Sequence, residues 1–272
     1  MLLNQSSMEI RLTRVLIISP FLLFVVVVNR SFRVASAFPS PKHFRSSISD
    51  GNKIPVVLYY ETLCPYCANF IAKANGLNKV FDDGLISIID LKLVPYGNAK
   101  IGANNTISCQ HGPSECFLNT IEACAINAWP TVSEHFPLIH CIEKFVHAHE
   151  FTQWESCFDE LGLESKHVYN CYRSGLGVEL ELGYAAETNA LEPPHQYVPW
   201  VVVNGNPLYE DYENFESYIC GAYSGTIVPE ACSELSIDAI ASKDSVQKHR
   251  VCYKDIFPFI SQVKEAVASL MW

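Results

Sequence analysis

The chain has 272 residues, a formal net charge of −10 at pH 7 with neutral histidines, and 11 cysteines. The acidic balance argues against nucleic acid or an anionic membrane surface as a partner. So many cysteines are typical of a secreted chain whose thiols are oxidised to disulfides. The length allows one compact core with a large insertion, or two small domains.

Residues 1–37 are interpreted as a signal peptide. Two arginines precede an apolar run at residues 15–28, and Ala35-Ser36-Ala37 offers a cleavage site. The run is shorter than the ~20 residues of a membrane span. An uncleaved signal anchor is the alternative, because two further arginines make the segment before the cleavage site polar. Removing four Arg and one Glu with the leader takes the net charge from −10 to −13. We therefore expect a lumenal or secreted protein without stable membrane insertion.

The pair Cys64 and Cys67 stands between an apolar strand and a helix. The strand, 56–60, is β-branched and aromatic, and residues 68–81 have apolar side chains at helical spacing. Amide dipoles at a helix N-terminus stabilise a thiolate, which is the form that attacks a disulfide. Strand, Cys-Pro-Tyr-Cys and helix predict the opening unit of a thioredoxin-like α/β fold.

In this interpretation Cys64 is the attacking nucleophile and Cys67 resolves the mixed disulfide. A cysteine with the reference pKa of ~8.5 is almost wholly a neutral thiol at pH ~5. Helix dipoles supply only ~0.3–2 kcal/mol, so an acidic lumen would require further stabilisation of the Cys64 sulfur. Two alternatives are a permanent Cys64–Cys67 bridge and a zinc site completed by Cys109 and His111.

Four further segments are predicted before and after this strand–helix unit in the chain. Residues 38–53 read as a flexible lead-in, and a second buried strand is predicted at 85–94, parallel to the first. Asn104 lies in a sequon on a polar loop and is the expected glycan acceptor. Helical periodicity with crowded cysteines then predicts a disulfide-rich helical insertion at about 108–191.

Strand character returns at 197–203. Thioredoxin-like folds place a cis-proline opposite the Cys-x-x-Cys, and Pro199 suits that position, with the Val198 backbone facing the substrate. Asn204-Gly205 predicts a hairpin turn, after which a closing helix is expected at 212–223. We therefore expect a thioredoxin-like domain at residues 54–225. The tail at 226–272 has no pattern that predicts its position in the fold, and it could be a processed extension.

Cysteine counting constrains the bridges. If Cys64 and Cys67 form a redox pair, nine cysteines remain, so at most four structural bridges can form. The odd cysteine is then either a free thiol or part of an intermolecular bond. A short Cys220–Cys232 loop is one pairing that the spacing allows. The disulfide candidates are Cys109, Cys116, Cys124, Cys141, Cys157, Cys171, Cys220, Cys232 and Cys252.

The run from Cys109 to Cys124 contains a Gly-Pro turn entering a helix. Glu115 is placed to meet the helix dipole, and we interpret it and His111 as a structural cap rather than an acid–base pair. The run matches the C-Q-H-G-x2-E-C-x2-N-x4-C signature of the gamma-interferon-inducible lysosomal thiol reductase (GILT) family. Cys64-Pro65-Tyr66-Cys67 and the segment 193–205 also resemble that family, and the similarity spans roughly 54–232.

The resemblance implies a thioredoxin-like fold with a helical insertion and reduction of protein disulfides, classically at acidic pH. It also implies a soluble, glycosylated protein that could be made as a precursor, but it does not fix the compartment. The signal peptide predicts the secretory pathway, with the lysosome or vacuole, the extracellular space and the endoplasmic reticulum as the expected destinations. Protein substrates with disulfides and a thiol reductant are the expected partners, with no cofactor or metal. The alternatives are a disulfide oxidase or isomerase of the same fold, and a cysteine-rich secreted binding module.

Overall fold

The computed structural model describes residues 53–238 and 250–254. The predicted signal peptide, nearly all of the predicted lead-in, and residues 255–272 of the tail lie outside the described residues. The described part contains no helix that is both long enough and apolar enough to cross a membrane.

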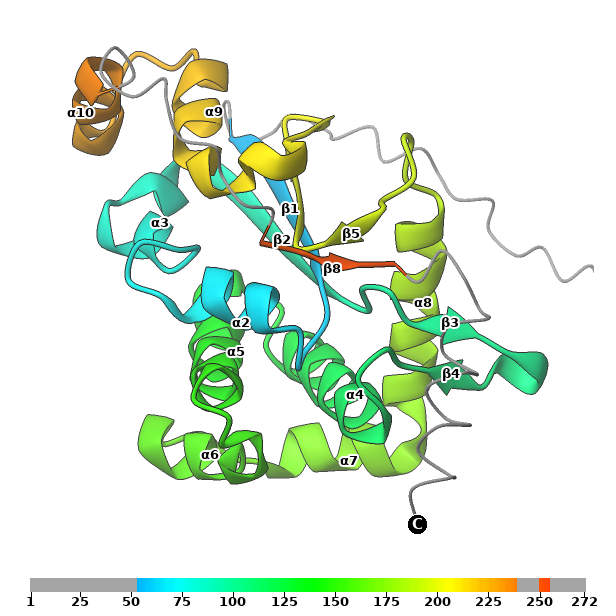
Figure 1. The fold of residues 1–272 in the computed structure, drawn as a ribbon. Coiled ribbons are helices and arrows are strands. Elements are labelled where there is room, and N and C mark those ends of the chain that lie inside the picture. The colour runs from blue at the N-terminus through cyan, green and yellow to red at the C-terminus, as the bar shows by residue number, and fades with distance from the viewer. Residues whose placement is uncertain (1–52, 239–249, 255–272) are drawn as a thin grey trace, which may run out of the picture. The chain divides into compact units, whose positions relative to one another are not determined.

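A four-stranded mixed sheet forms the centre of the fold, in the order β2-β1-β6-β7 (Figure 1). The strands are β1 (Ile54–Tyr60), β2 (Ile89–Pro95), β6 (Trp200–Val203) and β7 (Asn206–Pro207). The predicted parallel pairing of β1 with β2 is confirmed, and β6 runs antiparallel to β1. The Asn204-Gly205 turn joins β6 to β7 as predicted. The Val-, Leu- and Ile-rich sequences of β1, β2 and β6 supply buried side chains to the core, whereas β7 is Asn-Pro and lies at the edge of the sheet.

The predicted helix at 68–81 is divided in two. Helix α2 (Pro65–Ala72) ends at Lys73, and the short α3 (Lys79–Asp82) follows. A Cβ added at Gly76 would lie 2.1 Å from the Phe70 carbonyl oxygen, so the chain turns back closely here in a way that only glycine permits. The second strand likewise starts later than predicted, because a 3-10 turn (Leu85–Ser87) precedes it.

The predicted helical insertion is present. It consists of α4 (Pro113–Ala128), α5 (Val132–His147), α6 (Ser156–Leu161), α7 (Lys166–Ser174) and α8 (Leu176–Asn189). A short hairpin of β3 (Lys100–Ile101) and β4 (Ile107–Ser108) leads into it, with exposed Asn104 in a 3-10 turn between the strands. Disulfides join Cys124 to Cys171 and Cys141 to Cys157. These bridges tie α4 to α7 and α5 to α6.

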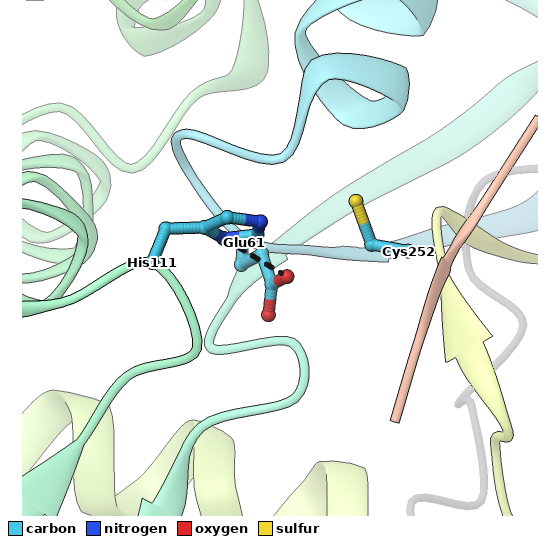
Figure 2. A group of neighbouring side chains, drawn as sticks. All are labelled: Glu61, His111 and Cys252. Atoms are coloured by element: carbon cyan, nitrogen blue, oxygen red, sulfur yellow. Dashed lines mark ion pairs between the residues drawn. The ribbon is translucent and has the colours of Figure 1, made fainter. Parts of the chain in front are cut away.

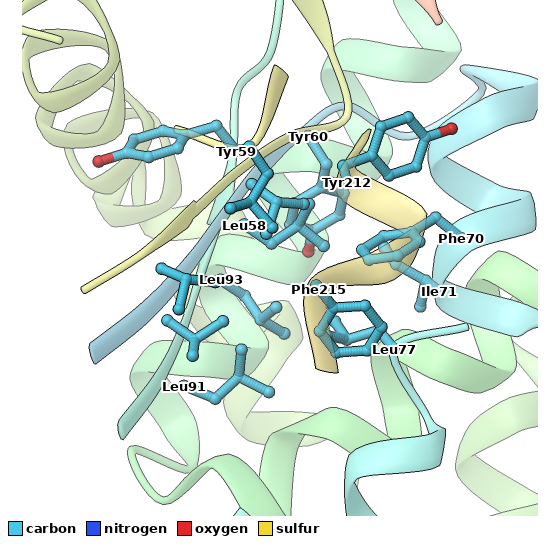
Figure 3. Close-up of a cluster of buried hydrophobic side chains, with 14 of the residues drawn as sticks. Leu58, Tyr59, Tyr60, Phe70, Ile71, Leu77, Leu91, Leu93, Tyr212 and Phe215 are labelled. Carbon is cyan, nitrogen blue, oxygen red and sulfur yellow. The ribbon is translucent and has the colours of Figure 1, made fainter. Parts of the chain in front are cut away.

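Apolar side chains from the sheet and from α2 form the main core (Figure 3). A 3-10 turn (Tyr209–Asn214) and helix α9 (Phe215–Ala222) supply Tyr212 and Phe215, whose rings meet Phe70 edge-on at 5.2 and 5.3 Å. The closing helix is therefore shorter than the predicted 212–223. Cys220 pairs with Cys232 of α10 (Glu230–Asp238), so this predicted bridge is confirmed.

Part of the tail that the sequence did not place returns to the body of the fold. Strand β8 (Cys252–Tyr253) pairs antiparallel with β5 (Tyr197–Val198). Figure 1 shows β8 running beside β5, above the start of α2. The last described segment of the chain thus lies next to the predicted active-site proline.

Candidate active site

Cys64 is the N-cap residue of α2, and Cys67 lies in the first turn of that helix. Leu63, just before, has a left-handed backbone with φ of 63°, which is uncommon for a residue with a side chain. This conformation turns the chain sharply from β1 into the helix. Both cysteine residues are fully buried in the structure.

Cys64 is bonded to Cys252, and Cys67 is a free thiol. This differs from the predicted distribution, in which Cys252 was a candidate for a structural bridge and at most four such bridges were expected. All eleven cysteines lie within the described residues, and they form five disulfides. The odd thiol is Cys67, so the structure does not hold a permanent Cys64–Cys67 bridge.

Pro199 follows Val198 through a cis peptide bond, as predicted. The Val198 carbonyl oxygen lies 3.9 Å from the Cys64 Sγ atom. Val198 also pairs with Cys252 in the β5–β8 ladder. The predicted nucleophile therefore lies next to the Val198 carbonyl group, which the cis peptide bond joins to Pro199.

The Cys109–Cys124 run delivers a polar loop to the same place. Cys109 is bonded to Cys116, which excludes the zinc site that the alternative interpretation built from Cys109. Glu115 is fully buried and accepts hydrogen bonds from the Gln110 and His111 amides at 3.2 and 2.8 Å. The His111 Nδ1 atom lies 2.5 Å from the same carboxylate. The Glu115 carboxylate therefore holds the backbone of the loop that precedes α4.

Glu61 is a site residue that the sequence analysis missed. It is fully buried, and it accepts a hydrogen bond of 2.6 Å from the Asn98 amide. Its Oε1 atom lies 3.6 Å from His111 Nδ1. A signal was available, because Glu61 stands between an apolar strand and the Cys-x-x-Cys, where a carboxylate is unexpected. No pattern, however, pointed to the loop residues that it contacts.

Glu61, His111 and Cys252 converge from three separate segments (Figure 2). One possible ligand atom from each lies within 4.8 Å of the others. The Cys252 sulfur is engaged in the bond to Cys64, so it is not a thiolate donor in this state. A structural zinc site uses four nitrogen or sulfur donors, which these three residues do not supply. We therefore treat the group as part of the thiol site.

Asn119, on α4, holds the loop in front of Cys64. Its Oδ1 atom accepts the Thr62 amide at 2.9 Å and the Thr62 hydroxyl at 3.1 Å, and all of these groups are buried. The Thr62 hydroxyl also lies 3.1 Å from the Glu115 carbonyl oxygen. One helix of the insertion therefore fixes the approach to the Cys-x-x-Cys.

Burial raises the pKa of the Cys67 thiol well above its ordinary value, and the nearby negative charge of Glu61 raises it further. Glu143 and Glu115 add smaller effects in the same direction. Cys67 is therefore a neutral thiol in this state.

Deeper in the fold, burial raises the pKa of Glu122 to about 8, and the Tyr60 hydroxyl donates a 2.6 Å hydrogen bond to its carboxylate.

The predicted site residues thus divide into two groups. Cys64, Cys67, Val198, Pro199 and Cys252 come together at the start of α2. The other disulfide candidates pair among themselves, and Asn104 lies on the exposed β3–β4 turn.

Comparison with known proteins places this arrangement in a family. Residues 55–161 match the model of the family described as gamma interferon inducible lysosomal thiol reductase (GILT). The chain is 44% identical over 185 residues to a gamma-interferon-responsive lysosomal thiol protein of Arabidopsis thaliana, covering 66% of this chain and 76% of that protein.

Animal relatives match over a similar span. The chain is 34% identical over 210 residues to the gamma-interferon-inducible lysosomal thiol reductase of Mus musculus, covering 74% of this chain and 77% of the mouse protein. It is 30% identical over 188 residues to GILT-like protein 2 of Drosophila melanogaster, covering 68% of this chain and 86% of the fly protein. The chain therefore belongs to the GILT family.

Proposed function

We propose that the protein is a thiol–disulfide reductase that acts on protein disulfides through Cys64 and Cys67, on a thioredoxin-like framework. The observation that carries the proposal is the convergence of three features at the start of α2. They are the Cys64 sulfur at a helix N-terminus, the free Cys67 thiol in the first turn of that helix, and the backbone of Val198 before cis-Pro199. Membership in a family of named thiol reductases supports the same conclusion.

In the proposed reaction the Cys64 thiolate attacks one sulfur of a substrate disulfide. A Cys64–substrate bond forms, and the second substrate sulfur leaves as a thiolate that takes up a proton. The Cys67 thiol then loses its proton and attacks the Cys64 sulfur, which releases the first substrate sulfur. The enzyme ends with a Cys64–Cys67 disulfide, and a thiol reductant returns both cysteines to the reduced state.

The route through the cell is part of the proposal. The sequence features of a signal peptide and the exposed Asn104 sequon support passage through the secretory pathway, with glycosylation at Asn104. The names of the plant and mouse relatives favour a lysosomal destination.

Reduction of insulin disulfides at pH 5 and pH 7 tests the activity. Cys64→Ser should fall to the uncatalysed rate, because no nucleophile remains. Cys67→Ser should lose turnover and accumulate mixed disulfides with substrate, because the resolving thiol is gone. A Cys141→Ser/Cys157→Ser double variant also removes cysteines, but it should retain activity. Unchanged turnover in the Cys64 variant would contradict the mechanism.

The reduction potential of the Cys64–Cys67 couple separates a reductase from an oxidase of the same fold. We expect a value within the range of thioredoxins and glutaredoxins, roughly −270 to −200 mV. A value near −120 mV, as in strongly oxidising relatives of thioredoxin, would favour the oxidase.

A further inference from the structure

Residues 250–254 occupy the place where a substrate would meet Cys64. We propose that this segment is a built-in substrate mimic, which holds the enzyme in a closed form through the Cys64–Cys252 disulfide until that bond is exchanged. The inference rests on the proposed reductase function, because the bridge blocks Cys64, the cysteine that we propose as the nucleophile. Three kinds of contact support it: backbone pairing, side-chain hydrogen bonds and the covalent bond.

The backbone pairing resembles the binding of an extended peptide. Val198 pairs with Cys252 and Tyr197 with Tyr253 in the antiparallel β5–β8 ladder. The Lys254 amide donates a 2.8 Å hydrogen bond to the Gln196 carbonyl oxygen and extends the pairing by one residue. The segment thus adds a strand next to cis-Pro199, which is how an extended polypeptide binds an open strand edge.

Three side chains from other parts of the fold donate hydrogen bonds to the main chain of residues 250–254. Asn98 Nδ2 donates to the Cys252 carbonyl oxygen at 3.0 Å, and Gln110 Nε2 donates to the Tyr253 carbonyl oxygen at 2.8 Å. The Tyr212 hydroxyl donates to the Arg250 carbonyl oxygen at 2.6 Å. All three donors meet main-chain oxygens, which every peptide has, so the same groups could hold other cysteine-containing segments.

The segment also closes the site sterically. Val251 is only 6% exposed and joins the main core, and Cys64 is completely buried. An external disulfide cannot reach a Cys64 sulfur that is buried and already bonded. The closed form must therefore exchange the Cys64–Cys252 bond and release the segment before the enzyme can act.

Cys67 provides an internal route for this release. Its thiol can lose a proton and attack the Cys64 sulfur, which forms the Cys64–Cys67 disulfide and releases Cys252 as a thiolate that takes up the proton. The exchange changes no oxidation state, and each isomer has five disulfides and one thiol. A low-molecular-weight thiol can instead attack the bridge from outside and reduce it in two steps.

Non-reducing peptide mapping of the full chain tests the proposal. The protein is purified without reductant, and its thiols are blocked with an alkylating agent at low pH before digestion. Counting thiols does not separate the two isomers, but mapping does. We expect a linked Cys64–Cys252 peptide with Cys67 alkylated in the wild type. Cys252 found only as an alkylated thiol, or bonded to any cysteine other than Cys64, would overturn the proposal.

Three variants sharpen the test. Cys67→Ser should hold the Cys64–Cys252 linkage in nearly every molecule, because no internal thiol can displace it. Cys252→Ser should move Cys64 into a bond with Cys67. Lys254→Ser serves as the matched control, because it changes the neighbouring side chain but keeps both the sulfur and the backbone pairing. Its linkage pattern should equal that of the wild type.

A kinetic measurement connects the linkage to activity. When oxidised protein is added to an insulin assay containing glutathione, the wild type should show a lag roughly tenfold longer than Cys252→Ser, because its Cys64 sulfur is shielded. Equal lags would overturn the closed-state proposal. After full prior reduction both proteins should reduce insulin. If neither does, the reductase function itself fails, while mapping still reports on the linkage separately.

Discussion

Asn119, a residue of the family signature, holds the loop before Cys64 through its side-chain oxygen, which accepts hydrogen bonds from Thr62. Asn119→Ala should leave the buried Thr62 amide without its acceptor, at a cost of about 1–3 kcal/mol in the free energy of unfolding. We also expect a severalfold loss in kcat/KM, because the loop before Cys64 is no longer fixed. Urea unfolding and insulin reduction measure the two effects.

Thr62→Val is the matched control for that prediction. It removes the hydroxyl bonds to Asn119 and Glu115 but keeps the amide bond, with little change in shape. Its cost should be smaller, about 0.5–1.5 kcal/mol, since only the hydroxyl interaction is lost. Equal costs for the two variants would show that the amide is not what Asn119 stabilises.

The chemistry expected of Cys64, Cys67 and Pro199 is predictable from the sequence because each belongs to a short local pattern. Glu61 and the Cys64–Cys252 pairing are not predictable in this way, because they depend on contacts between segments far apart in the chain. A Cys64 thiolate in an acidic lumen would still need stabilisation by neighbouring groups. Pro65 has no N–H, so the first amides available there belong to Tyr66 and Cys67.

Helices α4 and α8 approach closely where α8 has a glycine. A Cβ at Gly177 would lie 2.4 Å from Thr120 Cγ2 and 2.9 Å from Cys124 Sγ. Gly177→Ala should therefore destabilise the insertion by about 1–3 kcal/mol, as expected for overpacking in a dense core. Thermal unfolding followed by circular dichroism measures the loss.

Gly183 is the natural control on the same helix. A Cβ there would meet nothing within 4 Å. Gly183→Ala should stabilise the protein by up to about 1 kcal/mol, because alanine favours the helix more than glycine does. If both substitutions raise the melting temperature, helix propensity rather than packing decides the outcome at Gly177.

Elements with strong periodicity were predicted well, and their boundaries less so. The two long strands and the helical insertion follow from apolar spacing, which is local information. The division of α2 from α3 depends on the close approach of Gly76 to Phe70, which spacing does not reveal. Strand β8 has only two residues, and it forms because β5 offers it an edge, so no pattern within the tail could predict it.

Buried carboxyls make the stability of the whole chain depend on pH. Burial raises the pKa of Glu122 to about 8 and that of Glu181 to about 7, and burial with the neighbouring Glu122 charge raises that of Glu143. Above pH ~4.5 the folded chain holds protons that the unfolded chain has released, so the free energy of unfolding falls as pH rises toward 8. Burial also lowers the pKa of His195 to about 4. Between pH ~4 and ~6.5 the unfolded chain therefore binds a proton at this residue that the folded chain does not. In that range His195 makes the free energy of unfolding rise with pH, against the effect of the carboxyls.

We therefore expect the melting temperature to decline from pH 6 to pH 8, because three carboxyls outweigh the one histidine. Glu143→Gln should raise the melting temperature at pH 8, by about 2–4 °C for each kcal/mol recovered, and raise it by less at pH 5.5. Glu134→Gln, exposed on the same helix, should leave the pH profile of the wild type intact. A wild-type melting temperature that rises from pH 6 to pH 8 would contradict this account.

A disulfide reductase is exposed to its own chemistry, because every bridge in its fold is also a potential substrate. Four of the five bridges have at least one fully or almost fully buried cysteine, whereas Cys109 and Cys116 are both partly exposed. That bridge closes the loop carrying Gln110, which holds the Tyr253 carbonyl oxygen. Self-reduction should therefore begin at Cys109–Cys116, and its first structural effect would be a weaker hold on the C-terminal segment.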